Sequence, residues 1–95
     1  MAARFLRSHG YKILYRNFRA HRGGEVDVVC RDGDTLVFVE VKTRTSELFG
    51  RPADAVNKAK QELITRGAMA WLRMLDRPGI LFRFDIVEVV VETHW

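Results

Sequence analysis

Residues 25–42, EVDVVCRDGDTLVFVEVK, contain two runs of apolar and β-branched residues that flank a short polar stretch. The first run covers residues 25–31 and the second covers residues 35–42. The Asp-Gly-Asp sequence between them supplies residues that tight turns favour, so the segment predicts a β-hairpin. A turn at Gly33-Asp34 makes paired residue numbers sum to 67, whereas a turn at Asp32-Gly33 makes them sum to 65.

Charged side chains gather on one face of this hairpin. Because the side chains of a strand alternate between faces, four charged residues share a face in both registers: Glu25, Asp27, Glu40 and Lys42. The first register places Asp27 opposite Glu40 and Glu25 opposite Lys42, and the second moves Asp27 to a diagonal from Glu40. A three-residue loop breaks this pattern unless a bulge restores it. The other face is an apolar stripe that we expect the longest helix to cover: Val26, Val28, Cys30, Val37, Val39 and Val41.

The opposed carboxylates of Asp27 and Glu40 have a chemical consequence. Like charges directly opposite in a ladder repel each other, so the pair favours a compensating cation. Oxygen ligands alone select a hard ion, Mg²⁺ or Mn²⁺, over zinc. Such an ion neutralises charge on a phosphate and lowers the pKa of a bound water, which Lys42 is placed to orient or deprotonate. The alternative is a surface hairpin with a Glu–Lys cross-strand pair and one spare carboxylate.

The rest of the chain completes an α/β pattern. Gly10 ends a first helix, Gly23-Gly24 form a turn, and apolar residues recur at helical spacing from Ala53 to Leu75. The order helix, three strands, helix, strand predicts a mixed sheet of four or more strands with the long helix packed on one face. The expected ranges are helix 2–9, strand 11–18, turn 19–24, loop 43–52, helix 53–75 and a central strand 80–91.

Length and charge narrow the class of protein. The 95 residues suffice for one domain, residues 1–95, and the net charge is +4. Residues 1–22 carry six basic side chains and no acid. Twelve of the sixteen basic residues are arginine, whose planar guanidinium suits phosphate. The charge is therefore compatible with a polyanionic partner, nucleic acid being the first candidate, and equally with a small basic protein that has a solvated surface. One cysteine excludes an internal disulfide, no apolar run approaches the ~18 residues of a membrane helix, and the N-terminus does not resemble a signal peptide. We therefore expect a cytoplasmic protein with no membrane contact.

The spacing of Asp27, Glu40 and Lys42 resembles the PD-(D/E)xK signature of restriction-endonuclease-like nucleases. Further blocks occur in order along nearly the whole chain, and together they resemble the YraN-like family, a largely uncharacterised bacterial group related in fold to archaeal Holliday junction resolvases. The resemblance implies a restriction-endonuclease-like fold. The blocks are Gly10–Arg19, Gly24–Asp27, Leu36–Arg44, Phe49–Pro52, Ala55-Val56 with Lys60, and Arg83–Val87.

This resemblance implies roles for matching residues. Asp27 and Glu40 would bind the metal, and Lys42 would be the catalytic lysine. The backbone carbonyl of Val41 would complete the coordination. Glu25, in the Gly-Glu-x-Asp motif, is a candidate for a second metal or for supporting the first.

Basic and polar residues around this cluster are the expected contacts to nucleic acid. Some lie near the start of the Glu25 strand, others flank the loop or extend the lysine motif, and two lie on the polar side of the long helix beside Asn57. They are Arg16, Arg19, Arg22, Thr43, Arg44, Arg51, Lys60 and Gln61.

The N-terminal helix departs from the family pattern. In related resolvases a glutamate on this helix joins the site, whereas here Met1 directly precedes Ala2-Ala3 and the first acid is Glu25. We expect a shortened helix here, and two explanations stay open: either the N-terminus is trimmed or the protein lacks that carboxylate. The leading functional hypothesis is a Mg²⁺- or Mn²⁺-dependent endonuclease acting on branched, nicked or single-stranded DNA. The alternatives are a nucleic-acid-binding module that does not cleave and a protein-interaction adaptor, and the related resolvases' pairing allows for a homodimer.

Overall fold

The computed structural model describes residues 2–45 and 57–91. They form, in chain order, α1 (Ala2–Ser8), β1 (Lys12–Arg19), β2 (Glu25–Asp32), β3 (Thr35–Thr45), α2 (Lys58–Leu75) and β4 (Leu81–Val91). This order and the mixed sheet confirm the expected α/β, restriction-endonuclease-like fold class. No helix in the described part of the chain is long and apolar enough to cross a membrane.

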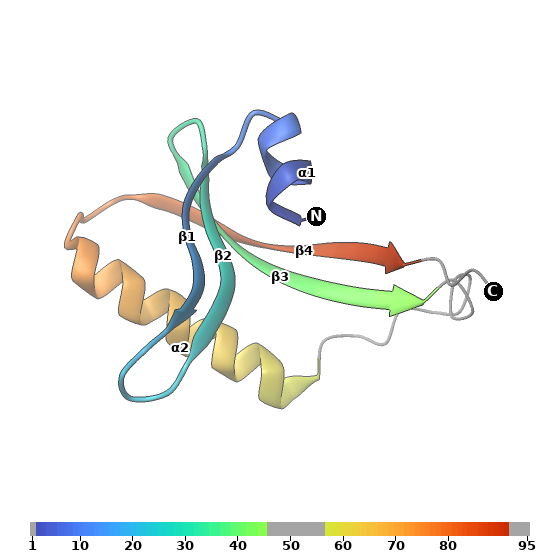
Figure 1. Ribbon diagram of the computed structural model, residues 1–95. Helices are drawn as coiled ribbons and strands as arrows, with labels where there is room; N and C mark the ends of the chain where they lie inside the picture. The colour runs from blue at the N-terminus through green and yellow to red at the C-terminus, as the bar shows by residue number, and fades with distance from the viewer. Residues whose placement is uncertain (1, 46–56, 92–95) are drawn as a thin grey trace.

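The four strands form one sheet in the order β1-β2-β3-β4. The first three strands are antiparallel neighbours, and β4 runs parallel to β3 because α2 crosses over between them (Figure 1). The expectation that strand 80–91 is central was wrong, because β4 is an edge strand of the described sheet. Its apolar side chains are accordingly not enclosed: Phe82, Phe84 and Ile86 are 42%, 45% and 60% exposed.

The core has two layers, one on each face of the sheet. On the face of α2, the buried residues are Phe18, Val26, Val29, Leu36, Phe38 and Ala68. On the face of α1, they are Leu6, Val28, Cys30, Val37 and Val39, with Val41 at the margin. The predicted apolar stripe therefore exists, but all of it except Val26 packs under α1 and not under the long helix. Both faces of the hairpin are apolar, and α2 covers the one with the larger side chains, Leu36 and Phe38.

The ends of α2 and β3 differ from the expected ranges. The N-cap of α2 is Asn57, whose side chain accepts a hydrogen bond from the Lys60 N–H at 2.8 Å, so the described helix begins at Lys58. Residues 53–56 of the expected helix lie outside the described residues, as does the expected loop from residue 46 onward. The first three residues of that expected loop continue β3, because they pair with β4 as far as Thr45.

Candidate active site

The β2–β3 hairpin has the register of the Gly33-Asp34 turn, since Val28 pairs with Val39. Within the described residues the ladder ends at this pair, so Asp27 and Glu40 lie directly beyond it. The backbone N–H of Val41 instead donates to Oδ2 of Asp27, at 2.8 Å. The two strands thus part where they carry the carboxylates, and the Asp27 side chain replaces a backbone acceptor.

A glycine contact with α2 holds the start of β2. A Cβ atom at Gly24 would lie 2.5 Å from the backbone nitrogen of Gly67, and one at Gly67 would lie 2.9 Å from the backbone nitrogen of Glu25. Gly24 also has a φ of +113°, which side chains rarely tolerate. This approach draws Glu25 against the helix. Lys60 lies seven residues before Gly67, two helical turns away on the same face of α2, and so faces the same strands.

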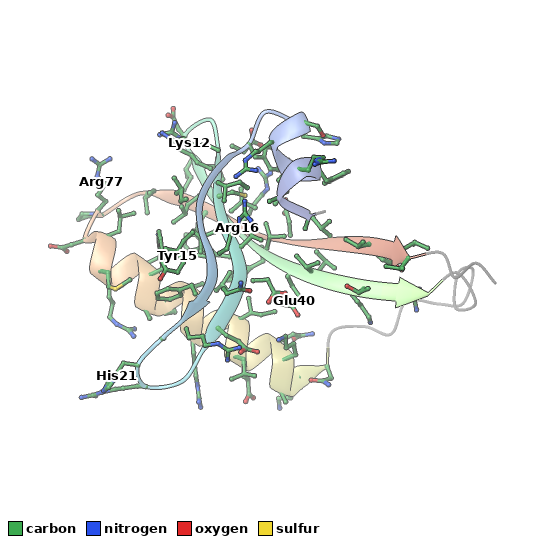
Figure 2. The ribbon with its side chains drawn as sticks, viewed as in Figure 1. Lys12, Tyr15, Arg16, His21, Glu40 and Arg77 are labelled. Carbon is green, nitrogen blue, oxygen red and sulfur yellow. The ribbon has the colours of Figure 1, made fainter. Side chains whose placement is uncertain are left out.

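The carboxylate of Glu40 is more enclosed than that of Glu25, whose side chain is 27% exposed. The Glu40 side chain is 12% exposed, and its Oε2 atom is buried without a hydrogen-bond partner. The pKa of Glu40 is raised above its ordinary value, first by burial and then by the negative charge of Asp27 and a hydrogen bond with it, while Lys60 opposes the shift. The expected pairing of Asp27 with Glu40 is therefore realised through their side chains, although not through the ladder. Figure 2 shows the Glu40 side chain between β3 and the N-terminal part of α2 in this view.

Lys60 lies between the carboxylates of Glu25 and Glu40 and contacts both. Its Nζ lies 2.7 Å from Oε1 of Glu25 and 3.4 Å from Oε1 of Glu40. On its other side Glu25 accepts from Nη1 of Arg19 at 3.1 Å. The hydrogen bond from Lys60 lowers the pKa of Glu25, and the same bond raises the pKa of Lys60. Opposite charges therefore alternate along the row Arg19, Glu25, Lys60, Glu40.

Lys42 shares a face with Glu40, because it lies two residues further along β3. It is half-buried, and its register partner on β4 is Glu88. The expected ladder pair of Glu25 with Lys42 was wrong. The β2–β3 ladder ends at Val28 and Val39, and the register partner of Glu25 is Arg19 on β1.

The oxygen donors at this point fit a hard divalent cation. The N–H and C=O of one residue in a strand point to the same edge, so the Val41 carbonyl faces the same side as the N–H that Asp27 accepts. With the orphaned Oε2 of Glu40, the site offers two carboxylates and a carbonyl. Mg²⁺ commonly binds through one or two carboxylates and keeps several waters. Residues 2–45 and 57–91 contain no group of three or more His, Cys, Asp and Glu side chains that could hold a metal. An ion at this site would therefore need the Val41 carbonyl and water as further ligands.

The residues expected to contact nucleic acid are spread over the sheet and α2. Arg16 and Thr43 are exposed on β1 and β3, Arg22 lies in the β1–β2 turn, and Gln61 is exposed on α2. Arg44 is buried and pairs with Glu88 of β4, Nη1 to Oε1 at 3.1 Å. Arg51 lies outside the described residues. The structure thus brings Arg19 and Lys60 to the carboxylates.

A half-open cavity of about 420 Å³ adjoins Glu40 on the α2 face. Its lining includes Gln61 and Ile64 of α2, Phe38 of β3, and Phe84 and Ile86 of β4. Phe84 and Ile86 were not among the expected site residues, because strand 80–91 was expected to be central. The signal was present in the alternation of Phe82, Phe84 and Ile86, which places the three side chains on one face.

Comparison with known proteins gives one consistent match. Residues 1–89 match the family model described as uncharacterised protein family UPF0102. A UPF0102 protein of Geobacter metallireducens is 49% identical over 89 residues, which are 94% of this chain and 72% of that protein. One of Chlorobaculum tepidum is 47% identical over 95% of this chain and 69% of its own length. One of Nocardia farcinica is 48% identical over 96% and 71%.

Proposed function

Because this chain belongs to the uncharacterised protein family UPF0102, the YraN family that its sequence resembles, we propose that it hydrolyses phosphodiester bonds in DNA with the help of Mg²⁺ or Mn²⁺. The proposed substrate is branched, nicked or single-stranded DNA. The observation that carries the proposal is the enclosed Asp27–Glu40 pair, in which one carboxylate oxygen of Glu40 is buried and unpartnered. Such an arrangement is unfavourable in a site that is purely structural.

Each residue of the cluster has a distinct task in this proposal. Asp27, Glu40 and the Val41 carbonyl hold the divalent ion, which supplies neutralising charge at the scissile phosphate and a water of lowered pKa. Lys42, on the same face as Glu40, orients the attacking water and takes part in its deprotonation. Lys60 offsets part of the negative charge of Glu25 and Glu40.

A second candidate function is a nucleic-acid-binding module that keeps the fold but does not cleave. The position of Lys60 favours it, because the ammonium group already contacts Glu25 and Glu40 and so compensates their charge without any metal. The two candidates share the basic surface and differ in the chemistry of the carboxylates. A homodimer, a cytoplasmic location and the assignment of residues 1–95 to one nuclease-like domain remain predictions.

The test is cleavage of end-labelled nucleic acids: single-stranded, duplex, nicked, flapped and four-way-junction DNA, with single-stranded RNA for comparison. Each is incubated with Mn²⁺, Mg²⁺ or a chelator. The variants are Asp27→Asn and Lys42→Ala, and Asp34→Asn is the matched control because Asp34 is exposed in the hairpin turn. The proposal requires metal-dependent cutting that is lost in the first two variants and kept in the control. Binding of DNA without cutting in any metal supports the second candidate instead.

A further inference from the structure

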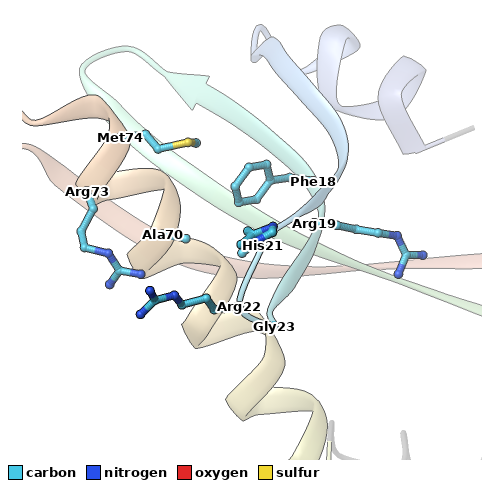
Figure 3. Close-up of a pocket in the computed structure, with 9 residues that line it drawn as sticks. Phe18, Arg19, His21, Arg22, Gly23, Ala70, Arg73 and Met74 are labelled. Carbon is cyan, nitrogen blue, oxygen red and sulfur yellow. The ribbon is translucent and has the colours of Figure 1, made fainter.

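A second, larger cavity lies at the β1–β2 turn, beside the C-terminal half of α2 (Figure 3). Its volume is about 710 Å³, within the range of roughly 300–1,000 Å³ that is usual for small-ligand pockets. Arg22 and His21 of the turn and Arg73 of α2 line it, together with Phe18 and Met74. Basic groups and an apolar wall therefore meet in one concave surface, and no carboxylate is among the lining residues.

Two of the arginines that line this cavity, Arg22 and Arg73, have no ion-pair partner among the described residues. Figure 3 shows the guanidinium groups of Arg22 and Arg73 directed into the same region. Arg19 also lines the cavity, but it is paired with Glu25. Two like charges that share a cavity repel each other, and an anion held between two planar guanidinium groups relieves that repulsion with charge-assisted hydrogen bonds.

The apolar part of the cavity specifies what the anion is attached to. Phe18 is buried and forms a wall, whereas Met74 is 66% exposed and offers a flexible apolar surface. A sugar and base can lie against such a surface while a phosphate is held by the guanidinium groups. The carboxylates of an acidic peptide could pair with the two arginines, but such a peptide has less apolar surface to pack against Met74.

The position of the cavity connects it to the carboxylates. Arg19 lines it and contacts Glu25, which contacts Lys60, which in turn contacts Glu40. The cavity and Glu40 therefore lie at the two ends of one row of contacting side chains.

We propose that this cavity holds one nucleotide unit of a nucleic-acid strand, with its phosphate between Arg22 and Arg73 and its sugar and base against Met74 and Phe18. The inference rests on the nucleic-acid-binding part of the proposed function and not on cleavage. His21 and Arg73 are thereby assigned to a binding surface that extends from the carboxylates to the tip of the β1–β2 turn.

The test is binding of fluorescently labelled single-stranded DNA by anisotropy, at salt concentrations from about 50 to 200 mM. The variant is Arg22→Gln/Arg73→Gln, in which both altered residues are exposed. Lys12→Gln/Arg31→Gln is the matched control, because these exposed residues are cross-strand partners at the opposite end of β1 and β2 and their loss removes the same charge. Thermal unfolding verifies that each protein is folded.

For a single strand, each lost phosphate contact lowers the slope of log affinity against log salt by about 0.7. The variant loses the one phosphate contact that Arg22 and Arg73 share, so the slope should fall by about 0.7 and the affinity ratio of wild type to variant should shrink about 2.6-fold across the fourfold salt range. The control should keep the wild-type slope. These results support the inference even if the wild-type chain cuts no substrate.

Three outcomes would overturn the inference. The first is an equal change of slope in the variant and the control, which would indicate general charge attraction. The second is that wild-type chain binds no DNA at low salt. The third is displacement of the DNA by a poly-glutamate peptide that loses affinity for the Arg22→Gln/Arg73→Gln protein, which would assign the cavity to an acidic protein segment.

Discussion

Replacing Glu40 by glutamine should stabilise the fold at neutral and alkaline pH. The buried carboxylate faces Asp27, and one of its oxygens has no partner. Glutamine has nearly the same shape, carries no charge, and has an amide group that can donate a hydrogen bond to Asp27. The substitution therefore removes repulsion without creating a cavity, whereas most substitutions of enclosed residues destabilise a protein.

The expected gain follows from the surroundings of Glu40. An unsatisfied buried polar group destabilises a fold by about 1–3 kcal/mol. Lys60 lies 3.4 Å from the other oxygen and recovers part of this, so we expect Glu40→Gln to raise the free energy of unfolding by about 1 kcal/mol. With a urea m-value of about 1–3 kcal/mol per molar, the unfolding midpoint should rise by roughly 0.3–1 M.

The pH dependence of the gain identifies its cause. The pKa of Glu40 is higher in the folded chain than its ordinary value of 4.5. Below pH 4.5, Glu40 is protonated in both the folded and the unfolded chain, so its charge does not lower the free energy of unfolding. As the pH rises above this value, the unfolded chain ionises first, so the wild type loses stability until the folded-state pKa is passed. The gain from Glu40→Gln should thus be absent near pH 4 and complete near pH 8.

Urea unfolding followed by tryptophan fluorescence measures both conditions. Asp34→Asn serves as the control, because it removes one exposed carboxylate from the hairpin turn. A loss of stability in Glu40→Gln at pH 8 would show that the ionised Glu40 side chain does not destabilise the fold. An equal gain at pH 4 and pH 8 would show that charge is not the cause.

Three further outcomes are expected. Gly24→Ala should lower the free energy of unfolding by more than about 2 kcal/mol, because its Cβ would lie 2.5 Å from a backbone nitrogen of α2 at a φ of +113°. Gly33→Ala should lower it by about 1 kcal/mol, because Gly33 has a φ of +58° but lies in open space. Equal urea midpoints of the two variants would contradict this expectation. Lys60 lowers the pKa of Glu25, so the ionised side chain stabilises the fold above about pH 4.5 and this contribution is lost as the pH falls; Glu25→Gln should flatten that acid limb, and an unchanged pH profile of the urea midpoint would argue against the pair. Burial raises the pKa of Cys30 to about 11, so its thiol should react with a disulfide reagent at pH 8 far more slowly in native than in unfolded protein, and similar rates would disprove that enclosure.

The hairpin and its two candidate registers were predictable because their information is local. Asp-Gly-Asp offers few turns, and period-two alternation then fixes which side chains share a face. The structure has the register of the Gly33-Asp34 turn, which places Asp27 and Glu40 at the end of the ladder. Alternation could not predict that the β2–β3 ladder ends at Val28 and Val39. The start of β2 is held by the contact between Gly24 and Gly67, which are 43 residues apart in the sequence.

The identity of the covering helix was not predictable from the same pattern. Both faces of β2 and β3 are apolar, as Val29 and Phe38 on one face and Cys30 and Val37 on the other show. Alternation separates these two sets but does not say which helix packs on which. The same limit applies to β4, whose apolar content is compatible with a central or an edge strand.

The partners of the charged groups depend on tertiary contacts. Lys60 was expected near the site because it lies on the polar side of the long helix, but helical spacing does not show that it bridges Glu25 and Glu40. Arg73 carried no local signal, because its importance arises from the turn residue Arg22 on the other side of the cavity. Long-range pairs of this kind are set by how the sheet and α2 pack.

If the Asp27–Glu40 pair holds the divalent ion that hydrolysis requires, the chain should bind Mn²⁺ at that pair. The most direct test is titration of the chain with Mn²⁺ near pH 8, with free Mn²⁺ followed by electron paramagnetic resonance. We expect saturable binding by wild type and by Asp34→Asn, and strongly weakened binding by Glu40→Gln. Equal binding by all three proteins, or no binding by the wild type, would contradict metal binding at that pair.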